Sequence, residues 1–135
     1  MSQFPVGHTV RRTATVTEQM IDEFARLSGD TSRLHMDRDF AIARGFRGRV
    51  AHGTLLGALI SGLIGTELPG DAGVLHELKL AFHQPCCAGD DIALQSTVID
   101  AHDTLQVLTC EVVISLASGD TLVKGRYRSG LLASP

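Results

Sequence analysis

The stretch that decides the fold is GTLLGALISGLIGTEL, residues 53–68. It is apolar nearly all round, and a helix without a polar face is one that a protein buries. Its small residues, from Gly57 to Gly65, keep the helix slim, so that another backbone can approach closely. Because each glycine inside a helix costs about 1 kcal/mol relative to alanine, packing must favour them. The sequence therefore predicts one buried helix over residues 53–66.

Strand-like segments surround this helix. One is expected before it, over residues 9–16, followed by a helix that Thr17 caps and Gly29 ends. Residues 30–36 have no sustained period and indicate a loop, and a short helix is expected from Asp37 to Arg44. Four β-like segments separated by turn residues follow the buried helix, at about 73–83, 90–100, 104–116 and 121–131.

This order of elements predicts an α+β fold. An antiparallel sheet needs an apolar layer on one face, and only the helix at 53–66 can supply it. We expect a hot-dog arrangement, a curved sheet wrapped around one long buried helix, in a single domain spanning residues 1–135. In the third late segment, Leu105, Val107 and Val113 share a face only if a bulge near Cys110 shifts the phase. The free sheet edge and the outer side of the helix favour a homodimer.

Composition limits the partners and the compartment. A net charge of −3 gives no basic footprint for nucleic acid. The longest apolar stretch, Thr54 to Ile64, is too short to span a bilayer easily, and the N-terminus has no apolar signal region. The three cysteines are an odd number with two adjacent, unlike a secreted disulfide framework. We expect a cytoplasmic protein without nucleic-acid or membrane partners.

Two features could carry acid–base chemistry. Asp30 and His35 lie five residues apart in the expected loop, and a carboxylate with an imidazole can take a proton from one atom and return one to another. Taken alone, they could equally be a turn residue and a surface histidine. Gly53 begins the buried helix, whose first N–H groups lack internal partners and can stabilise a developing oxyanion. The alternative for Gly53 is a simple helix cap.

Two other clusters of side chains are weaker indicators of function. Arg44, Arg47 and Arg49 form a basic stripe around Phe46, which could meet the phosphates of coenzyme A or an acidic carrier protein, or could simply be solvated. Three possible metal ligands lack the spacing of a structural zinc site, so no metal is expected there: His83, Cys86 and Cys87.

Residues 24–68 resemble the MaoC-like, (R)-specific enoyl-CoA hydratases. That family has an acidic residue followed by Asn-Pro-Leu-His, and then an apolar helix entered through Val/Ala-His-Gly. Here the corresponding stretches are DTSRLH at residues 30–35 and VAHG at residues 50–53, and LPG at 68–70 is also similar. Pro85 and the Gly89-Asp90 pair match the family's later strand-turn-strand pattern.

The resemblance implies roles for individual residues. Asp30 and His35 would hold a catalytic water and exchange protons with C2 and C3 of the substrate. The Gly53 amide would bind the thioester carbonyl. Supporting roles fall to Ser61 and Ser32, and Ile64 would line the acyl pocket.

One departure from the family concerns the residues between Asp30 and His35. Asn-Pro is replaced by Ser32-Arg33, so the constraint of proline on the backbone is absent and a long cation is added. Arg33 could meet a charged group of the substrate or remain a solvated loop residue. With Arg47 and Arg49, it is expected as a substrate-binding residue.

The function expected is that of a hydro-lyase. It would interconvert 2-enoyl and (3R)-3-hydroxyacyl thioesters by syn addition or removal of water, with the substrate carried by coenzyme A or an acyl-carrier protein. No cofactor or metal is expected. Two alternatives remain open, a hot-dog acyl thioesterase and a non-catalytic protein that binds acyl thioesters.

Overall fold

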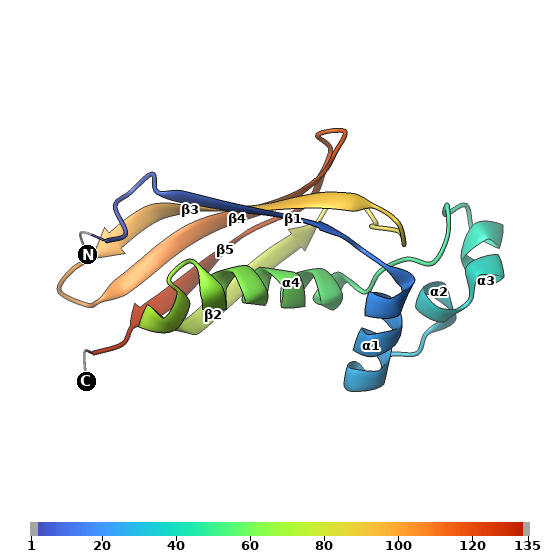
Figure 1. Ribbon diagram of the computed structural model, residues 1–135, viewed down its shortest axis with the longest axis horizontal. Helices are drawn as coiled ribbons and strands as arrows, with labels where there is room; N and C mark the ends of the chain where they lie inside the picture. Colours follow the sequence, from blue (N-terminus) through green and yellow to red (C-terminus); the bar gives the residue numbers. More distant parts are fainter. Residues whose placement is uncertain (1–2, 134–135) are drawn as a thin grey trace.

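The computed structural model describes residues 3–133. Its five strands form one antiparallel sheet in the order β1-β3-β4-β5-β2. The strands are β1 Thr9–Thr15, β2 Gly73–Phe82, β3 Asp91–His102, β4 Val107–Leu116 and β5 Thr121–Leu131. The helices are α1 Glu18–Ser28, α2 Arg33–Met36, α3 Arg38–Ala43 and α4 Gly53–Thr66, with a 3-10 turn η1 at Gly70–Ala72. Figure 1 shows the sheet curving over α4.

The core lies between α4 and the concave face of the sheet. From α4 it receives Leu55, Leu56, Ile60, Leu63 and Ile64. The sheet contributes inward residues such as Leu94, Leu108, Ile114 and Leu122. The expected hot-dog arrangement is therefore confirmed. The helix is covered on one side only, however, and its opposite side exposes a line of small residues: Thr54, Ala58, Ser61 and Gly65.

The third of the four late strands differs from the expectation. Its inward residues keep a strict alternation through the strand: Leu108, Cys110, Val112 and Ile114. No bulge therefore interrupts β4 itself at Cys110, and Leu105, Val107 and Val113 do not form its inward face. The irregularity lies on the neighbouring strand β3, between Val98 and Asp100, while Leu105 sits exposed in the preceding turn.

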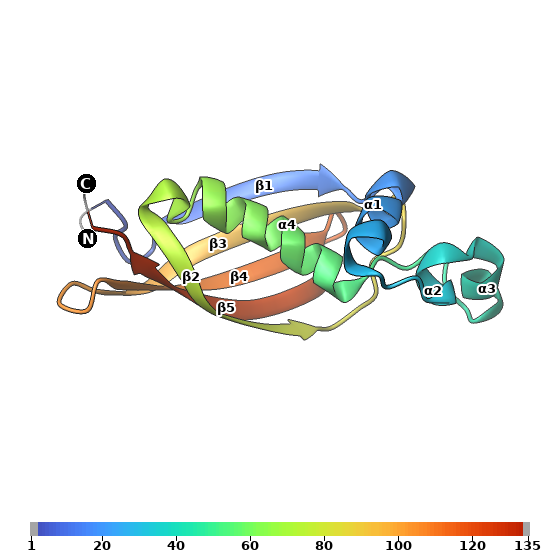
Figure 2. The same ribbon diagram turned by 90° about the horizontal axis from the view of Figure 1, so that it is seen from below.

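The first helix starts and stops where its sequence predicts. The Thr17 hydroxyl accepts from the Met20 amide at 3.1 Å, and Gly29 closes the helix in the left-handed region at φ 80°. Residues 30–36 are only partly a loop, because α2 forms one helical turn within them. In Figure 2, α2 and α3 lie beyond the end of the sheet.

A buried polar contact joins the end of α4 to the sheet. The Tyr127 hydroxyl donates to the Leu68 carbonyl at 2.8 Å and lies 2.6 Å from the Ser96 hydroxyl. Both tyrosine and serine are almost completely buried. Among residues 3–133, no helix has both the length and the apolar character needed to cross a membrane.

Candidate active site

Residues 49–52, here called the template segment, run directly into α4. Their position is fixed by the chain just before β3. The Ala51 amide donates to the Cys86 carbonyl at 2.7 Å, and the Ala88 amide donates to the Arg49 carbonyl at 2.9 Å. The first turn of α4 is therefore held in a defined place relative to the sheet.

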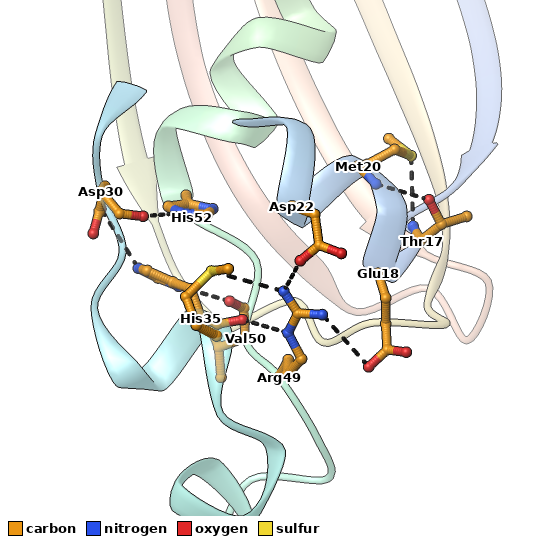
Figure 3. A network of polar contacts seen from close by, with 10 residues as sticks. Thr17, Glu18, Met20, Asp22, Asp30, His35, Arg49, Val50 and His52 are labelled. Atoms are coloured by element: carbon orange, nitrogen blue, oxygen red, sulfur yellow. Dashed lines mark hydrogen bonds and ion pairs between the residues drawn. The ribbon is translucent and has the colours of Figure 1, made fainter. Parts of the chain in front are cut away.

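The dyad segment, residues 30–36, is attached to the template segment by hydrogen bonds rather than by apolar packing (Figure 3). No residue of α2 is buried. The five bonds are Val50 N–H to Leu34 O at 3.1 Å, His35 Nδ1 to Val50 O at 2.7 Å, Arg49 Nε to His35 O at 2.6 Å, Arg49 Nη2 to Met36 Sδ at 3.7 Å, and His52 Nε2 to Asp30 O at 2.9 Å. Both predicted dyad residues are thus oriented by the chain that enters α4.

The bond from His35 to Val50 fixes the tautomer of the imidazole. A carbonyl only accepts, so Nδ1 carries the proton and Nε2 of the neutral ring has a free lone pair. This Nε2 lies 3.6 Å from Asp30 Oδ2, too far for a direct hydrogen bond. A water molecule has two protons and can donate one to each of two such acceptors. The pair is arranged to hold one water.

Ser32 supports this arrangement through its backbone. Its amide donates to Asp30 Oδ1 at 3.3 Å, and its carbonyl accepts from the His35 amide at 3.0 Å. The Ser32 side chain makes no capping bond to α2. An Asp30-centred turn therefore shapes the segment in which the related family has Asn-Pro.

A cavity of about 300 Å³ lies beside His35 at the start of α4. It is lined by His35, Val50, Ala51, Gly53, Leu56, Phe82, His83, Gln84, Pro85 and Cys86. Within residues 3–133 the Gly53 amide donates to no acceptor, so it is free to bind a ligand. A Cβ on Gly53 would lie 3.1 Å from the Phe82 ring, which packs over the helix start.

His52 lies against the dyad, and the sequence assigned it no role. It is 1% exposed, donates to the Asp30 carbonyl, and stacks on the His35 ring with 3.9 Å between centroids. The Phe24 ring contacts it from another side, at 4.9 Å. His52 is part of the VAHG motif at residues 50–53, which is the sequence feature that could have pointed to it. Its contact with the dyad depends on the fold.

Asp30, His35 and His52 also offer ligand atoms within 4.8 Å of one another. A metal ion lies in the plane of each imidazole that binds it. The two histidine rings are stacked at an interplanar angle of 25°, so their planes do not converge on one ion between them. The donor set suits a water between acceptors better than a metal.

Two predicted residues on α4 lie away from this cavity. Ser61 is exposed, eight residues beyond Gly53 and so roughly 12 Å along the axis, with no hydrogen bond to the dyad segment in the described part of the chain. Ile64 is 6% exposed, belongs to the core, and does not line the cavity. Within one chain neither residue contacts the dyad.

The structure gives the arginines of the expected basic stripe different surroundings, although Arg47 and Arg49 line one pocket of about 450 Å³ together with Arg38. Arg47 makes two hydrogen bonds of 2.9 Å to Asp90, and Arg49 is buried at 8% exposure. Arg33 is exposed but turns to α3, where it bonds Asp37 at 3.1 Å. Arg44 lies 3.4 Å above the Phe40 ring, with Arg33 at 4.5 Å. None of these arginines lines the cavity beside Gly53.

Asp90 secures the turn that positions the template segment. Burial alone would raise the pKa of this carboxyl, but the Arg47 hydrogen bonds and the Cys87 amide outweigh it and hold the pKa below its ordinary value. Burial also raises the pKa of the nearby Cys86 thiol to about 12, so this cysteine stays protonated and is a poor nucleophile.

A larger hollow of about 450 Å³ lies over β1, β3 and β4. Among the described residues that line it, only Arg11 and Asp91 are charged, and none is a histidine or cysteine. It offers no acid–base pair comparable to Asp30 and His35. The smaller cavity, which His35 lines at the start of α4, is the candidate active site.

Comparison with known proteins shows the family of this chain. The model of the MaoC like domain matches residues 3–118, and the chain belongs to that family. The chain is 31% identical over 120 residues to an (R)-specific enoyl-CoA hydratase of Aeromonas caviae, covering 89% of this chain and 90% of the relative. An enzyme with the same description from Rhodospirillum rubrum is 31% identical over 119 residues, covering 88% and 82%.

Among solved structures, the (R)-hydratase from A. caviae involved in PHA biosynthesis superposes with a TM-score of 0.93. The two chains are 29% identical, and the match covers 98% of this chain and 100% of the other. The fold of the present chain is thus that of a MaoC-like hot-dog protein.

Proposed function

We propose that this protein is a hydro-lyase that interconverts 2-enoyl and (3R)-3-hydroxyacyl thioesters. One observation carries the proposal. His35 Nε2 and Asp30 Oδ2 stand 3.6 Å apart as two acceptors beside a cavity that also contains the free Gly53 amide. This is the arrangement needed to hold water next to an activated double bond.

The chemistry follows from these groups. The thioester oxygen accepts from the Gly53 N–H at the positive end of α4, which stabilises enolate-like charge. In hydration, the water oxygen bonds to C3 while the dyad takes one of the water's protons. The dyad then delivers a proton to C2 and so returns to its starting protonation state. The H and the OH have been added to the same face of the double bond. Because the two groups are coupled, Asp30 and His35 act as a unit.

The proposal needs no cofactor or metal, because the thioester itself withdraws electrons from the double bond. The substrate is carried by coenzyme A or an acyl-carrier protein. The arginine contacts reported above support neither carrier over the other. The (R)-specificity of the related enzymes supports the (3R) configuration of the product.

We further propose a homodimer. β2 is an edge strand of the sheet, and it exposes apolar side chains at Val74, Leu75 and Phe82. A long apolar edge favours pairing with another strand. Light scattering should give the mass of two chains at micromolar concentration, and a stable monomer would refute the dimer. A cytoplasmic location is supported by three buried cysteines without a disulfide.

The direct test uses crotonyl-CoA and the purified protein. Hydration removes the enoyl absorbance without releasing thiol, and chiral analysis should give the (3R) product. Thiol release at the same rate as substrate loss would identify a thioesterase instead. Tight binding of the thioester with neither change would identify a non-catalytic binding protein.

A further inference from the structure

Arg49 is a buried charge with several protein partners. The residue is 8% exposed and follows a glycine in the template segment. Leaving a guanidinium buried without partners is strongly unfavourable, so its contacts reveal what it holds. It does not line the cavity beside Gly53.

The guanidinium joins two separate elements (Figure 3). On one side Nε donates to the His35 carbonyl at 2.6 Å. On the other, a terminal nitrogen donates to Asp22 on α1 at 2.5 Å, and Glu18 lies 3.8 Å away. The planar guanidinium spreads its donors over a wide, rigid fork, which reaches two separated acceptors better than the compact ammonium of a lysine does.

These contacts complete the fixation of His35. Its ring is held by the Val50 carbonyl, and its own backbone carbonyl is held by Arg49. The backbone of Arg49 is itself bonded to the Ala88 amide. The position of Nε2 is therefore set from both ends of the residue, although α2 has no buried residue of its own.

We infer that Arg49 is a positioning residue, which clamps the backbone of His35 to α1 with Asp22 as its principal counterion. The kinetic consequence rests on the proposed function, whereas the structural consequence does not. Misplacement of an acid–base group by about 1 Å can lower a rate by about a hundredfold. The role differs from the substrate contact that the sequence suggested for this arginine.

Hydrogen exchange tests the clamp without an activity assay. In Arg49→Met, amides 35–37 should exchange at least about tenfold faster, while β3 and β4 stay protected. Arg12→Met is the matched control, because Arg12 is also ion-paired, to Glu67 at 2.9 Å, but at the other end of α4. Unchanged exchange at 35–37 in a folded Arg49→Met protein would overturn the inference.

Kinetics then separate positioning from substrate binding. Arg49→Met should lower kcat by about a hundredfold with KM within about twofold, and Arg49→Lys should recover only part of the loss. A raised KM with unchanged kcat would instead assign Arg49 to the substrate and overturn the inference. An inactive wild-type protein would count against the proposed function alone, since exchange still tests the clamp.

Asp22→Ala provides a second variant in case Arg49→Met does not fold. The Asp22 side chain is 57% exposed, so its loss should leave the global fold intact. It should accelerate exchange at 35–37 in the same direction but by less. In the double variant the effect should be smaller than the sum of the two single effects, because both act through one contact. If the effects of the two substitutions on exchange at 35–37 were strictly additive, the clamp would be contradicted.

Discussion

The core around α4 and the dyad segment before it are held by different kinds of interaction. In the core, Ile60, Leu63 and Leu68 are fully buried among apolar side chains. The dyad segment instead depends on five hydrogen bonds to the template segment and on the stacking of His35 against His52. Apolar burial is non-directional and stabilises the fold, whereas hydrogen bonds are directional and place particular atoms. The difference predicts that stability and catalysis can be changed separately.

Loss of either dyad residue should have the largest effect, and only on catalysis. Asp30→Asn and His35→Gln should each lower kcat by about a thousandfold or more, because proton transfer to and from the substrate is lost. Thermal melting should change little in Asp30→Asn, since the Asp30 side chain is 50% exposed. Near-wild-type turnover of crotonyl-CoA by either variant would remove the dyad assignment.

Truncation in the core should give the opposite result. Ile60 is completely buried on α4, so Ile60→Ala should lower the free energy of unfolding by about 3 kcal/mol. Urea denaturation measures this change. At a temperature where the variant is folded, kcat should remain close to the wild-type value. A stable but inactive Ile60→Ala protein would show that the two regions are not separable.

Asp90 connects the two regions, and its effect should depend on pH. Asp90→Asn removes the charged partner of Arg47 and should cost about 2 kcal/mol at pH 7. Because folding lowers the pKa of this carboxyl, its stabilisation is present above the unfolded value of about 3.9 and is lost as pH falls through the folded pKa. The stability gap between wild type and variant should therefore narrow below about pH 4. A gap that is constant from pH 7 to pH 3 would contradict this account.

The smallest effect is expected at Tyr127. Tyr127→Phe removes the hydroxyl that bonds the Leu68 carbonyl and Ser96, and should cost about 1 kcal/mol. Denaturant midpoints with an unchanged m-value would measure it. Since this contact lies at the end of α4 opposite Gly53, kcat should not change. A loss of activity would show that the far end of the helix influences the dyad.

The sequence by itself determined most of the elements and indicated where the candidate site lies. The apolar run at 53–66 predicts the buried helix, Thr17 and Gly29 mark the ends of α1, and the spacing of the dyad and VAHG motifs points to the site. These features depend on residues close together in the chain. Periodicity and capping are local, so they can be read without knowing the fold.

Only the tertiary structure decided which partner each polar group has. Arg49 and Asp22 are 27 residues apart, and Arg47 and Asp90 are 43 apart. Nothing local separates a solvated arginine from a buried one, so the sequence did not show that Arg49 is buried against Asp22 or that Arg47 pairs with Asp90. The stacking of His52 on His35 could not be predicted from the sequence either, because it forms only when the fold places the template segment against the dyad segment. Long-range approach of the chain, which sequence periodicity does not encode, sets these contacts.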